Sequence, residues 1–313
     1  MLYVLNPMDA VARFPFRLYR QMDADPRHWQ VAALGGLFTL SWMTSDFGVT
    51  LPTLCLSFTG AMIAQLLGTT ISNARDGNPF LYRFEWKSAL ITALGITLLL
   101  RAADPWIWFA AGFFGIALKF LVRIDGKHIF NPGCIGIVIM MLLLGNKAWV
   151  SPGQWGQAPL VAGYAMALAA LTLSSAKRLD IALGFLLGFA AILFVRAAWL
   201  GDPMVIPMHQ MSSGALLIFA FFMITDPRST PDSRLGRILF ALMVAGLAAW
   251  FTIGPNVRGA PLMALAALAW TTPVLDRFLP AHRFHWSQPR SAASPKQLNY
   301  SLMPLQGTKE THP

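Results

Sequence analysis

The chain has 313 residues, of which 56% are hydrophobic and only 12% charged, and its formal net charge is +10. Soluble domains carry about 25% charged residues, so this composition excludes an ordinary soluble protein and indicates an integral membrane protein. The positive charges lie between apolar runs rather than on one basic face. They therefore indicate a role in membrane topology and argue against nucleic-acid binding.

Residues 1–28 form a basic N-terminal segment that we expect on the cytoplasmic side. Val11, Phe14 and Leu18 recur at helical spacing, with arginines on another face, which suits a segment lying on the membrane surface. No apolar stretch typical of a signal peptide occurs in it.

A transmembrane domain is predicted over residues 29–278. Ten apolar spans divide it, near 29–46, 51–71, 88–101, 105–122, 130–147, 158–175, 180–200, 213–225, 236–254 and 259–276. The tail, residues 279–313, is rich in Pro, Ser, Gln and Lys, which predicts a disordered cytoplasmic extension.

The positive charges support this map of spans. With the N-terminus inside, all of the 24 Lys and Arg except Arg101, Lys147, Arg196 and Arg258 fall on the inner side. This bias predicts a multi-pass protein of the inner membrane with both termini in the cytoplasm.

Ten spans divide into two sets of five, about 29–150 and 155–278, and an odd number inverts the second set. The third member of each set is short: Ser88–Arg101 and Ser213–Thr225. Short segments at matching positions of two halves indicate buried sites at an inverted-repeat interface. The predicted fold is therefore all-α and polytopic, with about ten transmembrane helices in two inverted repeats.

The eighth span begins on small polar residues after His209. Its length, at about 1.5 Å per residue, falls short of a hydrocarbon core of about 30 Å. A helix that starts inside the membrane turns its unpaired N–H groups toward something buried. The alternative is an ordinary tilted helix whose first turn lies among the headgroups.

Two motifs occur together in this chain. Lys127-His128-Ile129-Phe130-Asn131-Pro132 enters the fifth span, and Ser213-Gly214-Ala215 through Thr225-Asp226-Pro227 makes up the eighth. From about Arg27 to Trp286 the chain resembles the family that contains the D subunit of the Rnf electron-transport complex and the B subunit of the sodium-translocating NADH:quinone reductase.

The resemblance implies ten helices in two inverted repeats, bound flavin, and partner subunits that couple electron transfer to ion movement. It also implies FMN attached to the threonine of a Ser-Gly-Ala-Thr motif. Here that position is Leu216, which has no hydroxyl. Divergent relatives occur outside complete Rnf complexes, including in biosynthetic clusters for enediyne natural products.

Two groups of residues are candidate flavin-binding residues. Ser212 and Ser213 can cap the eighth helix and offer N–H groups, Gly214 and Ala215 leave room for a flat ring, and Leu216 stands at the attachment position. The alternative is a plain N-cap and a helix contact.

The second group, His128, Asn131 and Pro132, lies at the inner mouth of the fifth span. These residues are candidates for an inner flavin or quinone pocket, although Asn131 as N-cap and Pro132 in a first turn also have a purely structural explanation. We expect His128 to be neutral because Lys127 is adjacent. Asp226 is expected to form a turn with Pro227 and to pair with Arg228 or Arg234.

The sequence shows no metal-ligand spacing and no nucleophile motif. The function predicted is therefore a membrane subunit of an Rnf-like electron-transport system, which binds riboflavin or FMN non-covalently and relays electrons with other membrane subunits, with quinone as a further candidate partner. The alternative is a flavin-free transporter or export component linked to natural-product biosynthesis. A third possibility is a scaffold subunit.

Overall fold

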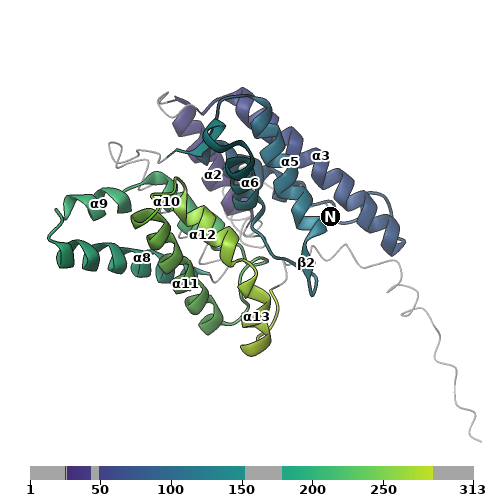
Figure 1. The fold of residues 1–313 in the computed structure, drawn as a ribbon. Coiled ribbons are helices and arrows are strands. Elements are labelled where there is room, and N and C mark those ends of the chain that lie inside the picture. Colours follow the sequence, from purple (N-terminus) through teal and green to yellow (C-terminus); the bar gives the residue numbers. More distant parts are fainter. Residues whose placement is uncertain (1–24, 26, 44–48, 152–177, 285–313) are drawn as a thin grey trace, which may run out of the picture.

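The structure, a computed structural model, describes residue 25 and residues 27–43, 49–151 and 178–284 (Figure 1). The expected sixth span, 158–175, lies outside the described residues. The same holds for most of the basic segment 1–28 and for the tail beyond residue 284.

Helices dominate the part of the chain that is described. The first half contains α2 (Arg27–Met43), α3 (Leu51–Asp76), α4 (Trp86–Leu99), α5 (Trp106–Leu121) and α6 (Pro132–Leu144), with a 3-10 turn at Gly145–Lys147. The second half contains α8 (Leu179–Leu200), α9 (Val205–Met211), α10 (Gly214–Ile218), the π-helix η3 (Phe219–Met223), α11 (Arg234–Ile253), α12 (Ala260–Leu268) and α13 (Thr271–Phe278).

Local sequence explains several helix boundaries. Thr50 and Thr53 form a capping box at the start of α3, and Gly77 ends that helix in the left-handed conformation. The side chain of Asn131 accepts a hydrogen bond from the backbone N–H of Cys134 at the start of α6, followed by Pro132 in the first turn. Ser233 caps α11 in the same way through Gly236.

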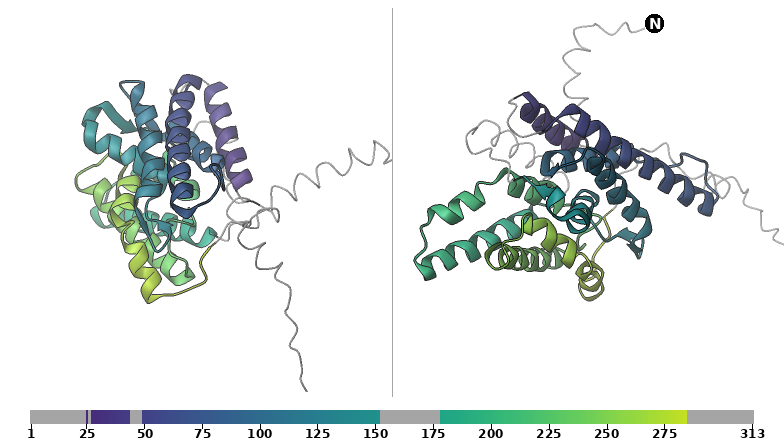
Figure 2. Two further views of the ribbon diagram at one scale, coloured as in Figure 1. Left: turned by 90° about the vertical axis from the view of Figure 1, so that its right-hand side faces the viewer. Right: turned by 45° about the horizontal axis from the view of Figure 1, so that its top comes forward.

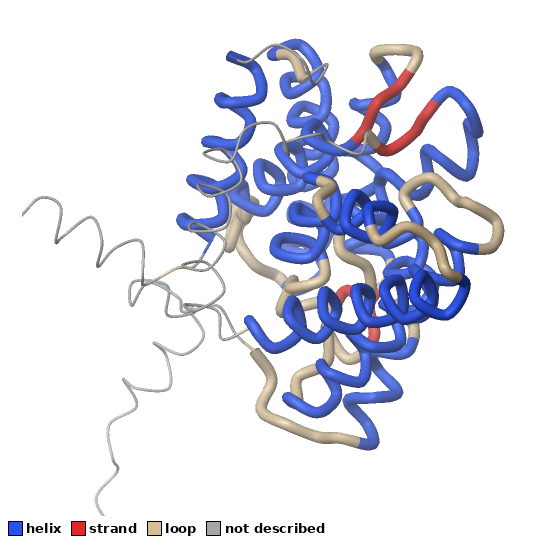
Figure 3. The backbone as a smooth tube through the Cα atoms, turned by 90° about the vertical axis from the view of Figure 1, so that its left-hand side faces the viewer, coloured by secondary structure: helices blue, strands red, loops and turns tan. Residues whose placement is uncertain are grey.

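Two short strand pairs lie at separate places in the molecule (Figure 3). β1 (Leu100–Ala102) pairs antiparallel with β4 (Ala148–Val150), with Arg101 opposite Trp149. β2 (Arg123–Ile124) pairs with β3 (Lys127–His128) across Asp125 and Gly126, both at positive φ as a two-residue hairpin requires. We call the two ends of the molecule the β1–β4 end and the hairpin end.

Among the described helices, three are long and apolar enough to cross a membrane: α3, α8 and α11. A fourth would be the pair of α9 with the segment Gly214–Met223, which meet at a bend of 49°. The chain is thus a mostly helical membrane protein, as its composition predicts.

Helix packing follows the same order in both halves. α5 packs against α3 and α6, and α11 packs against α8 and α12. Figures 1 and 2 show the first-half helices, in purple to teal, beside the second-half helices, in green to yellow. The α6–α12 contact joins the two sets in one apolar core. The ten-helix inverted repeat itself stays a prediction.

Two elements differ from the sequence expectation. The polar approach to the eighth span, His209 to Ser212, belongs largely to helix α9, so the segment after Ser213 continues a bent helix pair. The last span is divided at Ala269–Trp270 into α12 and α13 rather than forming one helix.

Candidate functional site

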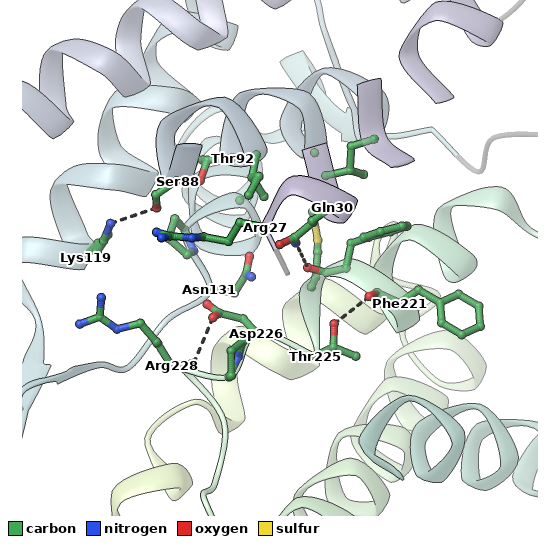
Figure 4. Close-up of a pocket in the computed structure, with 18 of the residues that line it drawn as sticks. Arg27, Gln30, Ser88, Thr92, Lys119, Asn131, Phe221, Thr225, Asp226 and Arg228 are labelled. Atoms are coloured by element: carbon green, nitrogen blue, oxygen red, sulfur yellow. Dashed lines mark hydrogen bonds between the residues drawn. The ribbon is translucent and has the colours of Figure 1, made fainter. Parts of the chain in front are cut away.

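A cavity of about 90 Å³ lies between the two short third helices, at the hairpin end (Figure 4). The first turns of α4 line it from Ser88 to Gly95, and the end of the eighth span lines it from Ile218 to Arg228. The start of α4 and the end of η3 therefore meet at one pocket, so these two helices run in opposite directions. The first turns of α2 and α6 complete the wall.

Glu85, the N-cap residue of α4, faces three cations in this pocket. Its carboxylate oxygens lie 2.9 Å from Lys119 Nζ, 3.5 Å from Arg27 Nη1 and 3.6 Å from Arg228 Nη1. Burial acts to raise the pKa of Glu85, but the charge of Lys119 and the two guanidinium groups outweigh it and lower this pKa to about 2. Glu85 is therefore ionised at neutral pH.

Lys119 is buried near the end of α5, with 4% of its surface exposed. Besides Glu85, its ammonium group donates to Ser88 Oγ at 2.9 Å and to Gln65 Oε1 at 3.2 Å. Three acceptors on α3 and at the start of α4 thus satisfy the three N–H bonds of this buried cation.

His128 and Asp226 form a buried pair across the two halves. Asp226 Oδ2 lies 3.1 Å from His128 Nε2, and its other oxygen accepts a hydrogen bond from the Arg228 backbone N–H at 3.1 Å. Burial acts to raise the pKa of Asp226, and the bonds from His128 and Arg228 lower it to about 2. Burial lowers the pKa of His128, so its imidazole is neutral at pH 7.

These contacts correct two expectations about the pair. The neutrality of His128 has burial as its main cause, with Lys119 and Arg228 as the contributing cations, rather than the adjacent Lys127. Asp226 pairs with His128 and with a backbone amide, rather than with the side chain of Arg228 or Arg234.

Lys127 turns to the other side of β3. Its ammonium group contacts Asp232 Oδ2 at 2.8 Å and Asp276 Oδ2 at 2.7 Å, and it donates to the carbonyl of Thr230. A second cavity, of about 320 Å³, lies there between the hairpin and α13, and His128 borders both cavities.

The structure brings together one of the two predicted residue groups. His128, Asn131 and Pro132 all line the cavity between the short helices. The Asn131 amide faces it (Figure 4), and its oxygen is already bonded as the N-cap of α6.

The other group, Ser212 to Leu216, lies at the opposite end of the eighth span. Ser212 Oγ donates to the carbonyl of His209, Ser213 is the N-cap residue of α10 without a side-chain capping bond, and Gly214 and Leu216 are buried, with Ala215 packed at the edge of the core. None of the five lines the cavity described above. Their role in binding stays a prediction.

Sequence reasoning missed Glu85, Lys119, Arg27 and Arg178 as site residues. The available signal was the placement of single charges at the ends of apolar spans, which was interpreted as an effect of topology and snorkelling. Periodicity cannot distinguish a charged side chain that turns into the protein from one that turns to the headgroups.

Comparisons with known proteins give a consistent family. A sequence model described as the NQR2, RnfD, RnfE family matches residues 142–285. Over 325 aligned residues, the chain is 27% identical to the D subunit of the ion-translocating oxidoreductase complex of Alcanivorax borkumensis, with 83% of this chain and 89% of that protein covered.

Two further relatives carry the same description. The protein from Ectopseudomonas mendocina is 25% identical, covering 83% of this chain and 91% of its own length. The protein from Pseudomonas paraeruginosa is 29% identical, covering 69% of this chain and 78% of its own length.

Proposed function

Since this chain is a distant relative of the NQR2, RnfD, RnfE family, we propose that it is a membrane subunit of an Rnf-like electron-transport complex that holds a flavin without a covalent bond. The observation that supports this proposal is the polar pocket where the two short helices meet, lined by His128 and Asn131. Other membrane subunits of the complex are its partners.

A flavin would supply the electron transfer when bound, since the side chains in the pocket have no redox chemistry of their own. The protein's own residues would bind and orient it. Thr92, Asn131 and Gln30 present hydroxyl and amide groups suited to the polar edge of the ring, and Ile91, Ile218 and Phe222 provide apolar walls.

The fit is chemical rather than volumetric. Pockets for ligands of this size usually enclose about 300–1,000 Å³, and this cavity encloses about 90 Å³. Accommodating the ring system therefore requires α4 and the end of the eighth span to separate. The π-helix η3 on one wall is a device found at sites where a helix must adjust.

Covalent FMN at Leu216 does not fit the residues present. Leu216 is buried in the apolar core, and no oxygen is available there for a phosphoester. Acid precipitation of purified protein should leave all flavin in the supernatant. A fluorescent band after denaturing electrophoresis would contradict this expectation and would direct attention to Ser213 or Thr225.

The site itself can be tested by filling it. Gly95 lines the cavity, and a Cβ added there would lie 3.5 Å from the methyl group of Met223, so Gly95→Leu places bulk between the short helices. The variant should lose the flavin absorbance near about 450 nm in mild detergent. Gly35→Leu is the matched control, because a Cβ at Gly35 meets no atom within 4 Å.

Full flavin content in a folded Gly95→Leu variant would exclude this pocket as the flavin site. Absence of flavin from wild-type protein, even after incubation with FMN or riboflavin, would instead favour the flavin-free alternative, a transporter or export component. Two observations favour that alternative: the hydrocarbon side chain at position 216 and the small, charged cavity.

A further inference from the structure

Four helices begin at the cavity between the short helices. α2 starts at Arg27, α4 follows Glu85, α6 follows Asn131, and α8 follows Arg178, and all four of these residues line the cavity. The four helices have 17, 14, 13 and 22 residues. Each N-terminus has unpaired N–H groups and about half a positive charge, so their convergence favours an anion.

The side chains add to this potential. The lining includes four cations, Arg27, Lys119, Arg178 and Arg228, against two carboxylates, Glu85 and Asp226. Both carboxylates are ionised, since their pKa values are lowered to about 2. With the imidazole of His128 neutral, the lining still has two more positive than negative charges. Nearby Asp25 pairs with Arg27, but the same carboxylate also pairs with Lys87.

Arg178 is the most buried cation of the second half at this pocket. Only 3% of its surface is exposed, and its guanidinium donates to the carbonyls of Pro231 at 2.9 Å and Pro227 at 3.5 Å. Among the described residues, no carboxylate oxygen lies within 4.0 Å of it. A buried cation that only carbonyl groups solvate is expected to attract an anion.

Thr92 provides a second, independent indication of a ligand. It lies on the cavity wall with 5% of its surface exposed, and its hydroxyl has no hydrogen-bond partner in the described part of the chain. Thr97, one and a half turns further along the same helix, bonds instead to the carbonyl four residues before it. Figure 4 shows Thr92 on the pocket side of α4, near Ser88. Buried hydroxyl groups normally have a partner, and a bound oxyanion would provide one.

We propose that this pocket is a binding site for a phosphate-class oxyanion, held by the converging helix N-termini, Arg178, Arg228 and the Thr92 hydroxyl. The cavity volume, about 90 Å³, suits an anion of this size better than a complete nucleotide or flavin. The phosphate can be free, or it can be the end of a larger ligand such as FMN whose remainder lies outside. The site does not depend on whether the protein takes part in electron transport.

The test uses the full-length protein in detergent with sodium phosphate as the probe. At constant ionic strength, set with sodium chloride, saturating phosphate should raise the Tm by about 5 °C or more because it binds only the folded state. Arg228→Gln and Thr92→Val should weaken phosphate binding, the arginine variant by about tenfold or more because a charged hydrogen bond is lost.

Arg196→Gln is the matched control, because Arg196 pairs with Asp202 at the far end of α8. Arg178→Gln serves as a third variant, and the Arg228 and Thr92 variants keep the test decisive if it fails to fold. Equal stabilisation by phosphate and chloride, or unchanged phosphate affinity in both Arg228→Gln and Thr92→Val, would overturn the proposal.

Competition separates the two sources of phosphate. If FMN displaces phosphate and riboflavin does not, the site holds the phosphate end of a flavin. If neither displaces it, the site holds a free oxyanion. A protein that lacks flavin but binds phosphate would refute the proposed function while leaving this site intact.

Discussion

At the scale of single residues, the cavity is organised around one carboxylate. Glu85 is the only anionic partner of the buried Lys119 among the described residues, whereas Glu85 itself also contacts Arg27 and Arg228. The two members of the Glu85–Lys119 pair are therefore not equivalent. Removing the acid leaves a buried ammonium group without a counter-charge, and removing the amine leaves the acid with two cations.

This asymmetry predicts an order of stability. Glu85→Gln should destabilise the protein by roughly 3 kcal/mol or more, as expected when one partner of a buried ion pair is lost. Lys119→Met should cost less, and the double variant should be more stable than Glu85→Gln alone. Thermal unfolding of the three variants in one detergent measures this. An equal loss in both single variants would contradict the assigned contacts.

The same pair should show in the pH dependence. The pKa of Glu85 is lowered from its ordinary value of 4.5 to about 2 in the folded state. Its stabilising contribution is therefore complete above about pH 4.5 and is lost as the pH falls toward 2. The stability difference between wild type and Glu85→Gln should shrink over this interval.

The sequence alone predicted part of this site. His128, Asn131 and Pro132 were identified because a polar, proline-containing entry to an apolar span is unusual, and they do line the cavity. Arg178 and Lys119 were not identified, because the direction in which a terminal charge turns depends on packing between segments far apart in the chain. Lys119 meets Gln65 and Glu85 only once α3, α4 and α5 have assembled.

At the scale of elements, bare backbone contacts bring the helices together. A Cβ at Gly112 would lie 2.2 Å from the Ser57 carbonyl oxygen on α3, and one at Gly115 would lie 2.3 Å from the Pro132 carbonyl oxygen on α6. Two glycines three residues apart thus face two different neighbours of α5. The sequence indicated close packing at these small residues, but not that the two contacts involve separate helices.

Gly112→Ala should accordingly push α3 and α5 apart and destabilise the protein by about 1–3 kcal/mol, the usual cost of overpacking. Gly246→Ala is the matched control within α11, since a Cβ there meets no atom within 4 Å. The control should be neutral or more stable by about 0.5–1 kcal/mol because alanine favours the helix. Thermal unfolding of both variants distinguishes them, and similar Tm values would show that the α3–α5 contact is looser than described.

At the scale of the whole molecule, polar contacts join the halves at the hairpin end. Glu85 meets Arg228, His128 meets Asp226, and Lys127 meets Asp232 and Asp276, each pair with one member from each half. At the β1–β4 end the contact is apolar, where a Cβ at Gly259 would lie 2.9 Å from the Val150 side chain. The cavity therefore lies at the polar end of the interface between halves.

Apolar periodicity and charge bias in the sequence predicted the positions of the described long helices well. They did not reveal α9 or the break between α12 and α13, because a bend inside an apolar run leaves the hydropathy unchanged. The strand pairs were also not predicted. Strands of two or three residues, such as Leu100–Ala102, are too short to produce an alternating pattern.

The two ends of the molecule should lie on opposite sides of the membrane. At the hairpin end are Arg75, in the last turn of α3, and Arg234, which begins α11. Near the other end are Asn146, just before β4, and Met204, beyond the end of α8. α8 has 22 residues, which at about 1.5 Å each span about 33 Å and cross the hydrocarbon core.

Single cysteines at these four positions test both the arrangement and its orientation. In full-length protein with Cys55 and Cys134 replaced by alanine, a membrane-impermeant maleimide applied to intact cells should label Asn146→Cys and Met204→Cys. Arg75→Cys and Arg234→Cys should react only after permeabilisation, because the excess of positive charge retains their loops in the cytoplasm. Arg75 and Asn146 report on the first half, and Arg234 and Met204 on the second. If Arg75→Cys and Arg234→Cys reacted from opposite sides, α4 and the eighth span could not share one pocket, and the inverted relationship between the halves would be wrong.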